Sequence, residues 1–347
     1  MNSKTLIAVI GLGAMLGAGA VLVATGGIPL PGATGGKATG PEAAKPIPAA
    51  DPAAAPMPPA KSVTPPQVED PAYTAFEQGK YLTALKLAEE AAGKGDKQAH
   101  TLIARIHEGG LGVDKNEGKA AEWYQKAADL GDVPAMVSLG TMRATGRGVD
   151  KDLNKAAELF EKAAVTGDPL ANYNLGLLFL KGEGKPENPY RAAAHIRYAA
   201  EKGVARAQYD LASLYQNGTG LETDGLEAAS WLSKAADQGL AEAQFDYAVM
   251  LLRGFGLKVD GAKAVKHLTA AAEAGITGAQ NRLGRVYAEG LGVERNPKEA
   301  AKWRLVAKAN GVKDDELDVM VDTLPAADRL AAEKAATLWR EKKQVGQ

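Results

Sequence analysis

The residues that first suggest chemistry are histidines, and their spacing argues against a metal centre. His107 and Glu108 begin like the His-Glu pair of zinc proteases, but Leu111 stands where the second histidine ligand should be. His195 and His267 share one position of a repeating pattern, two repeats apart. Packed helices lie about 8–10 Å apart, so these two side chains are too distant to share an ion. We predict no metal site and interpret both as packing residues, because other copies carry tryptophan there: Trp123, Trp231 and Trp303.

The sequence also lacks a nucleophile motif and a cofactor loop. It has no cysteine, which excludes disulfides, thiolate catalysis and zinc–cysteine sites. None of its six serines lies in a Ser-x-x-Lys or Gly-x-Ser-x-Gly motif. Gly-x-Gly pairs such as Gly146 and Gly148 recur between expected helices, which favours turns over phosphate-binding loops. We therefore predict no catalytic residues, no cofactor and no enzymatic activity. The net charge of −1 argues against a nucleic-acid partner.

Polar side chains recur at two positions of a repeating block, and they are the candidate binding residues. The first position holds, in successive copies, Asn174, Asp210, Asp246 and Arg282. The second position, seven residues further on, holds Lys181, Asn217, Arg253 and Glu289. An offset of seven places both positions on one face of a helix. Two interpretations stay open: an ordinary solvated surface, and a concave groove that binds a protein partner through these residues.

The block that positions these side chains is 36 residues long and occurs six times without a gap from Asp96 to Gly311. A fixed period of this length is typical of a solenoid, in which each unit buries its apolar face against its neighbours. Every copy ends in a glycine: Gly131, Gly167, Gly203, Gly239, Gly275 and Gly311.

Within each copy, the apolar spacing predicts two helices, A and B, joined by a glycine loop. An Asn or Asp precedes helix B in all six copies, as a helix N-cap should: Asn116, Asp152, Asn188, Asp224, Asp260 and Asn296. Pro189 and Pro297 follow two of these caps, at the first helical position. The closing glycine fits the left-handed residue after a helix. Two alanine columns on helix B should let helices approach closely: Ala120, Ala156, Ala192, Ala228, Ala264 and Ala300; and Ala127, Ala163, Ala199, Ala235, Ala271 and Ala307.

The flanking segments complete the expected domain organisation. Residues 1–25 are a signal anchor or signal peptide, and residues 26–71 are a disordered linker rich in Pro, Ala and Gly. Residues 72–95 form a shorter first unit. Residues 96–311 are the six repeats, and residues 312–347 are helices that cap the array, which a solenoid needs to cover its terminal apolar surface.

The N-terminal segment predicts an exported chain. Residues 5–24 carry no charge and follow Lys4. A helix of about 20 apolar residues can just cross a bilayer, so this segment could anchor the chain in the inner membrane. The alternative is a cleavable signal peptide, with Ala18-Gly19-Ala20 as the processing site. Both alternatives predict a periplasmic protein, either anchored to the inner membrane or soluble after cleavage.

The repeated columns resemble the Sel1-like repeat family, which is related to tetratricopeptide repeats. One copy shows the pattern in the segments 171–176, Gly182-Glu183-Gly184 and Ala199-Ala200, closed by Gly203. The first unit, residues 72–95, looks more like a plain tetratricopeptide repeat. The resemblance implies an all-α fold, a right-handed α/α solenoid of helix-turn-helix repeats. With the exported N-terminus, the chain looks like a bacterial envelope version.

The resemblance also implies a class of function. Proteins of this family are adaptors and scaffolds, so we expect a non-enzymatic scaffold that binds a partner peptide or domain on the concave face of the A helices. One alternative is a structural component of an envelope, motility or polar complex, in which the linker matters more than the groove. Another is an enzyme or ligand binder that acts on the cell wall, against which the absence of an acid/base or nucleophile cluster argues.

Overall fold

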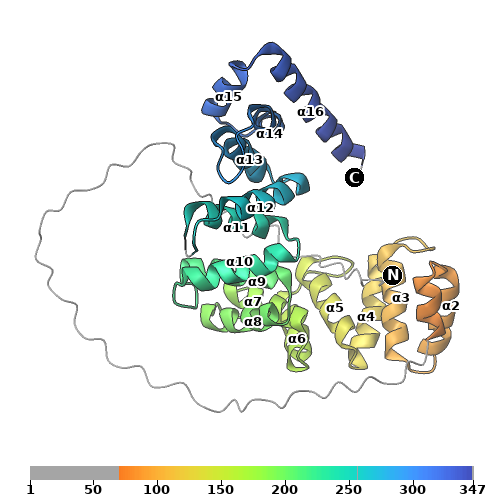
Figure 1. Ribbon diagram of the computed structural model, residues 1–347. Helices are drawn as coiled ribbons and strands as arrows, with labels where there is room; N and C mark the ends of the chain where they lie inside the picture. The colour runs from red at the N-terminus through yellow and green to blue at the C-terminus, as the bar shows by residue number, and fades with distance from the viewer. Residues whose placement is uncertain (1–69, 256, 346–347) are drawn as a thin grey trace, which may run out of the picture. The chain divides into compact units, whose positions relative to one another are not determined.

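The computed structural model describes residues 70–255 and 257–345, and within them it is entirely helical (Figure 1). Sixteen helices follow one another in this part of the chain, and consecutive helices pack together in pairs. The predicted all-α solenoid is therefore confirmed. The uncharged segment 5–24 and nearly all of the predicted linker 26–71 lie outside the described residues.

Six helix pairs make up the repeats, and every pair begins with a helix A of 13 residues. The A helices are α3 (Lys97–Gly109), α5 (Val133–Thr145), α7 (Pro169–Lys181), α9 (Ala205–Asn217), α11 (Ala241–Arg253) and α13 (Thr277–Glu289). The B helices are α4 (Glu117–Asp129), α6 (Leu153–Val165), α8 (Pro189–Glu201), α10 (Gly225–Asp237), α12 (Gly261–Ala274) and α14 (Pro297–Ala309).

The predicted boundaries of helix B are confirmed in all six repeats. Each Asn or Asp of the N-cap column accepts a hydrogen bond from a backbone N–H of the first turn; Asp224, for example, accepts from Leu226 and Glu227 at 2.9 and 3.0 Å. The glycine that closes each repeat has a φ between 80° and 102°, in the left-handed region that a side chain disfavours. These residues therefore begin and end helix B for the reasons that the sequence indicates.

The start of helix A has a second set of caps that the sequence analysis did not identify. In the first three repeats the carboxylate of an aspartate accepts hydrogen bonds there from backbone N–H groups of the first turn; these aspartates are Asp96, Asp132 and Asp168. In the last three repeats an apolar residue stands at this position and no side chain caps the helix: Val204, Leu240 and Ile276. A side chain therefore caps helix A only in the first three repeats, whereas helix B is capped in all six.

The two alanine columns of helix B form the interior of the array, as predicted. All twelve of these alanines are fully buried. Helix A supplies small residues opposite them in several repeats. A Cβ at Gly140 would come within 2.6 Å of Phe160, and one at Gly176 within 2.7 Å of Ile196. Small side chains thus let the two helices of a repeat approach closely while larger apolar residues fill the remaining space.

The loop between helices A and B contacts the preceding repeat more closely than a side chain would allow. A Cβ at Gly148 would overlap the backbone carbonyl group of Glu117, in the first turn of α4. The same overlap would arise at Gly184 with Leu153 and at Gly220 with Pro189. The second glycine of the Gly-x-Gly loop is therefore required by a backbone-to-backbone contact between repeats, as well as by its positive φ.

Additional helices flank the repeats at both ends. Before them lie α1 (Pro71–Glu77) and α2 (Tyr81–Ala92), with Ala84 and Ala88 fully buried. After them lie α15 (Asp315–Asp322) and α16 (Ala326–Val345), and α16 packs back against α14. The Nε1 of Trp339 on α16 donates a hydrogen bond to Oε2 of Glu273 at 2.8 Å. The last helix thereby covers the end of the array.

The described helices do not include one that is both long and apolar enough to cross a bilayer. The predicted membrane or signal segment, residues 5–24, is not among them.

We predict that Gly148→Ala destabilises the protein more than Gly131→Ala. Both glycines have positive φ, 66° and 80°, but only Gly148 lies against another repeat. Gly131→Ala should lower the free energy of unfolding by about 1–2 kcal/mol, the cost of a left-handed alanine. Gly148→Ala should cost about 1–3 kcal/mol more, because the methyl group must displace helix α4. Denaturant unfolding measures both values, and equal losses would show that the loop contact is not essential.

Candidate functional site

Side chains of consecutive A helices meet through tyrosine–aspartate hydrogen bonds. The hydroxyl of Tyr173 on α7 donates to Oδ2 of Asp210 on α9 at 2.7 Å. One repeat further on, the hydroxyl of Tyr209 donates to Oδ2 of Asp246 on α11 at 2.8 Å. Two of the four candidate residues in the first polar position therefore join one repeat to the next.

Asp210 is buried, which contradicts both interpretations of its row, since a solvated surface and a binding groove each require an accessible side chain. Its relative exposure is 6%, and that of Tyr173 is 3%. Burial raises the pKa of the Asp210 carboxyl, although the Tyr173 hydrogen bond and the Arg206 charge act in the opposite direction. Burial likewise raises the pKa of Asp246. Repeat spacing predicts which face of a helix a residue occupies, but the neighbouring repeat decides whether that face is covered.

The other candidate residues differ in their accessibility. Asn174, Asp246, Lys181 and Arg282 are partly exposed, whereas the remaining three are exposed: Asn217, Arg253 and Glu289. The Arg253 charge lowers the pKa of Arg282, and the Glu289 charge raises it. Asp210 and Asp246 belong instead to the tyrosine contacts of α7, α9 and α11. The role of all these residues in binding a partner stays a prediction.

Arg206 and Glu242 are charged groups of the same region that the sequence analysis did not single out. The Nε of Arg206 lies 3.4 Å from Oδ1 of Asp210, and its Nη1 lies 3.7 Å from Oε1 of Glu242. The Glu242 charge also raises the pKa values of Asp210 and Asp246. The surface over α9 and α11 therefore combines three carboxylates with one guanidinium group. Arg206 stands four residues before Asp210, and Glu242 stands four residues before Asp246. Residues four apart are neighbours on a helix surface, and this spacing could have identified both.

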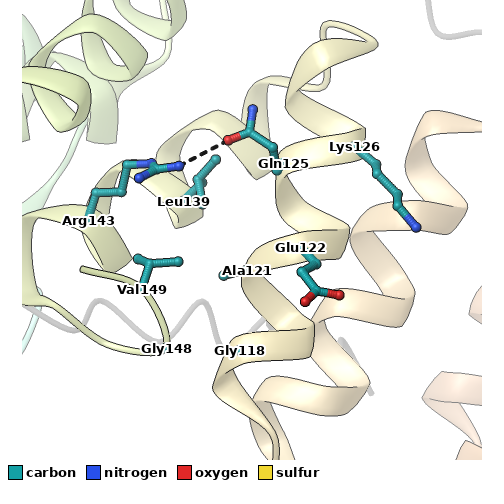
Figure 2. Close-up of a pocket in the computed structure, with 9 residues that line it drawn as sticks. All are labelled: Gly118, Ala121, Glu122, Gln125, Lys126, Leu139, Arg143, Gly148 and Val149. Carbon is teal, nitrogen blue, oxygen red and sulfur yellow. Dashed lines mark hydrogen bonds between the residues drawn. The ribbon is translucent and has the colours of Figure 1, made fainter. Parts of the chain in front are cut away.

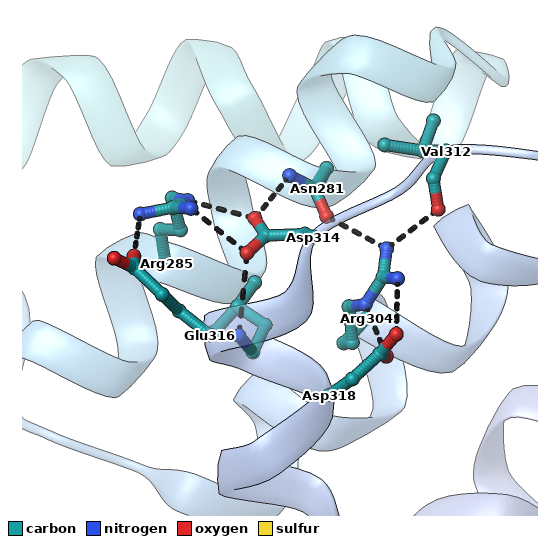
Figure 3. A network of polar contacts seen from close by, with 8 residues as sticks. Asn281, Arg285, Arg304, Val312, Asp314, Glu316 and Asp318 are labelled. Carbon is teal, nitrogen blue, oxygen red and sulfur yellow. Dashed lines mark hydrogen bonds and ion pairs between the residues drawn. The ribbon is translucent and has the colours of Figure 1, made fainter. Parts of the chain in front are cut away.

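A denser network of polar side chains connects α13, α14 and the start of α15 (Figure 3). Nε and Nη2 of Arg285 donate to the two carboxylate oxygens of Asp314 at 2.7 and 2.8 Å. The amide of Asn281 donates to the same carboxylate at 2.7 Å. Nε and Nη2 of the buried Arg304 donate to Asp318 at 2.7 and 2.9 Å. Each guanidinium in this network is therefore neutralised by a carboxylate.

Two hollows of the surface lie away from the candidate residues. One, of about 580 Å³, lies between α4, α5 and the following loop, where Nη2 of Arg143 donates to Oε1 of Gln125 at 3.3 Å (Figure 2). The other, of about 440 Å³, is lined by Arg197 and Tyr215. These two residues occupy the repeat positions of Gln125 and Arg143, two repeats further on. Both hollows are open grooves between repeats, and repeat geometry alone accounts for them.

The histidines considered as metal ligands lie in packing positions. The ring of His195 stacks on Phe179, with its Nδ1 2.9 Å from Oδ1 of Asn172, and His267 packs edge-on against Tyr247. Burial lowers the pKa values of both histidines. Residues 70–255 and 257–345 contain no group of three or more side chains placed to hold a metal ion.

Comparison with known proteins gives a consistent assignment. The sequence model of the Sel1 repeat matches residues 97–132, 133–164, 169–204, 205–240, 241–276 and 277–305. A crystal structure of a Sel1 repeat protein from Oxalobacter formigenes is 30% identical, with a TM-score of 0.60, over 69% of this chain and 98% of the other. A protective antigen of uropathogenic Escherichia coli strains, displaying an SLR fold, is 28% identical, with a TM-score of 0.54, over 79% of this chain and 68% of the other. No curated protein sequence matches the chain.

We predict that Asp210→Ala destabilises the fold, in contrast to an exposed substitution on the same face. The change leaves the buried Tyr173 hydroxyl without its acceptor and Arg206 without its closest carboxylate. It should lower the free energy of unfolding by about 1–3 kcal/mol. The matched control is Asn217→Ala, at an exposed position, which should stay within about 0.5 kcal/mol of wild type. If thermal unfolding shows the same stability for both variants, Asp210 does not join the repeats.

Proposed function

Because the chain belongs to the Sel1 repeat family, whose members generally serve as scaffolds for protein–protein interaction, we propose that it holds a protein partner on its helix A face. We define the helix A face as the eight candidate residues on α7, α9, α11 and α13, together with the groups that contact them. The proposed function is binding without catalysis.

The observation that carries this proposal is the arrangement of the A helices. The stacking of the repeats brings successive A helices close enough for their side chains to touch, as Tyr173 does with Asp210, 37 residues later. This places variable polar side chains in a row, while the alanines behind them are the same in every repeat. An extended surface of this kind presents several directional contacts to one partner, which is how solenoids bind.

The polar groups of this face favour binding over chemistry. The hydroxyl of Tyr173 donates to Asp210, and Arg206 forms ion pairs with Asp210 and Glu242, so each of these groups is engaged within the fold. Burial and the Asp210 charge raise the pKa of the Tyr173 hydroxyl. These groups fix the geometry of the face, and the exposed residues beside them supply the contacts to the partner.

We also propose that the repeats act outside the cytoplasm, in the cell envelope. The support is the uncharged segment 5–24 after Lys4, followed by a Pro-rich segment without aromatic residues. Such a segment would tether or release the repeats on the far side of the inner membrane, where the helix A face would meet its partner.

The proposed location is tested with a reporter enzyme that is active only outside the cytoplasm, fused after Gln347. We expect an active fusion, and loss of its activity when residues 5–24 are deleted, because this segment directs export. A fusion that is inactive although the protein accumulates would place the repeats in the cytoplasm and contradict the proposal.

The proposed binding face is tested by affinity capture from an extract of the source cells. The helix A variant Lys181→Ala with Asn217→Ala changes two accessible residues and should capture less partner at unchanged melting temperature. The matched variant Glu158→Ala with Lys162→Ala changes two exposed residues of helix B in α6 and should capture it fully. Loss of capture only in the helix B variant would move the binding surface to the other side of the repeats.

A further inference from the structure

The tyrosine–aspartate contacts between A helices occur at two successive steps and are absent at the last step, between α11 and α13. The two preceding steps pair Tyr173 with Asp210 and Tyr209 with Asp246. At the next step the equivalent residues are Phe245 and Arg282. Phenylalanine has no hydroxyl to donate, and arginine cannot accept a hydrogen bond. The contact is therefore absent there, and the charge at the aspartate position changes from negative to positive.

Arg282 is one of two arginines of this region whose charge has no direct partner among the described residues. Among the described residues it forms no hydrogen bond and no ion pair, although it is partly buried. Its neighbour Arg285 is bound by Asp314 and Glu316, and Arg304 is bound by Asp318. The carboxylates at this end of the array are thus already engaged by other arginines.

The surroundings of Arg282 leave an excess of positive charge. Burial lowers its pKa, and the nearby charges of Arg253 and Arg285 lower it further, more than Glu289 and Asp314 raise it. Arg253 is exposed at the end of α11 and also forms no ion pair with a described residue. Two guanidinium groups without an ion pair therefore stand on adjacent A helices, at the two polar positions that share one helix face. Such groups favour a ligand with carboxylates, which guanidinium groups bind in a bidentate manner.

We propose that Arg282 and Arg253 bind acidic side chains of the partner protein, in a peptide segment with neighbouring Asp or Glu residues. This inference rests on the proposed function, since it assigns the chemistry of the partner at one end of the helix A face. A partner carboxylate between α11 and α13 replaces the aspartate that this step lacks, and it neutralises the two arginines when the complex forms.

Carboxylates on α11, the helix that also carries Arg253, limit how far an anionic ligand can extend. Glu242 and Asp246 lie on α11, and Glu242 also acts on Asp210 of α9. A long polyanion, such as a nucleic acid, would continue from the arginines onto these carboxylates and be repelled. A peptide can place acidic residues at the arginines and neutral or basic residues beyond them. Charge complementarity thus selects a short acidic segment of a protein.

The test uses the full chain and a fluorescein-labelled hexaglutamate peptide with blocked ends, with hexaglutamine as the neutral counterpart. We expect hexaglutamate to raise the fluorescence anisotropy and hexaglutamine not to. Arg282→Gln should weaken hexaglutamate binding about tenfold, as loss of a charged hydrogen-bonding partner does. Arg282→Lys should give an intermediate affinity, because it keeps the charge without the planar fork.

The matched control is Arg340→Gln, an exposed arginine of α16, which removes the same charge and should change the affinity by less than about twofold. The melting temperature provides a second readout. Arg282→Gln should melt at or above the wild-type temperature, because it removes repulsion from Arg253 and Arg285. A lower melting temperature would assign Arg282 a structural role and overturn the inference.

Two further results would overturn it. The first is equal hexaglutamate affinity of Arg282→Gln and Arg340→Gln. The second is binding of oligothymidylate as tight as that of hexaglutamate with the same dependence on Arg282, since this would show a general anion site. Suppose that one of these two results is found, and that the Lys181→Ala, Asn217→Ala double variant nevertheless captures less partner. The helix A face then remains the proposed binding surface, and only the proposal that it binds acidic side chains is contradicted. If that variant keeps its partner while hexaglutamate binding depends on Arg282, the broader proposal fails instead.

Discussion

The close contact between a loop glycine and the preceding helix B fixes how one repeat stacks on the next. Gly148, Gly184 and Gly220 each lie so near the first turn of that helix that a Cβ would overlap its backbone. Backbone atoms are the least adjustable part of a structure, so this contact allows little variation in the angle or spacing of the repeats. The contact recurs at intervals of 36 residues, so it holds successive A helices in the same relation to one another.

Given this stacking, polar residues on the A helices have two uses. Some join the repeats, as Asp210 does by accepting a hydrogen bond from Tyr173 of the preceding repeat. Others keep unused hydrogen-bonding capacity, and Arg282 is an example, because it forms no hydrogen bond and no ion pair with a described residue. The same position of the repeat thus provides cohesion in the middle of the array and a candidate contact for a partner near its end. The repeat position that holds Asp210 and Arg282 therefore serves both the fold and the proposed binding.

Sequence reasoning predicted the parts of this fold that depend on local chemistry. Asp224 caps its helix because an N-cap is defined by residues next to it, and Ala199 is buried because helical spacing marks the packed face. It did not predict the burial of Asp210, because the covering Tyr173 stands 37 residues earlier, one repeat plus one position. The recurrence of tyrosine at that offset before Asp246 was the available signal. The helix A caps escaped notice because apolar residues such as Val204 replace them in later repeats.

The central claim is that the helix A face contacts the partner, and site-specific photocrosslinking in living source cells tests it most directly. A benzophenone amino acid placed at Asn217 samples the exposed end of α9, and one placed at Lys162 samples the exposed side of α6. The account predicts a discrete crosslinked adduct from position 217 and none from position 162. An adduct from position 162 alone would contradict it, because the partner would then lie on the B helices, where the row of variable polar residues has no part.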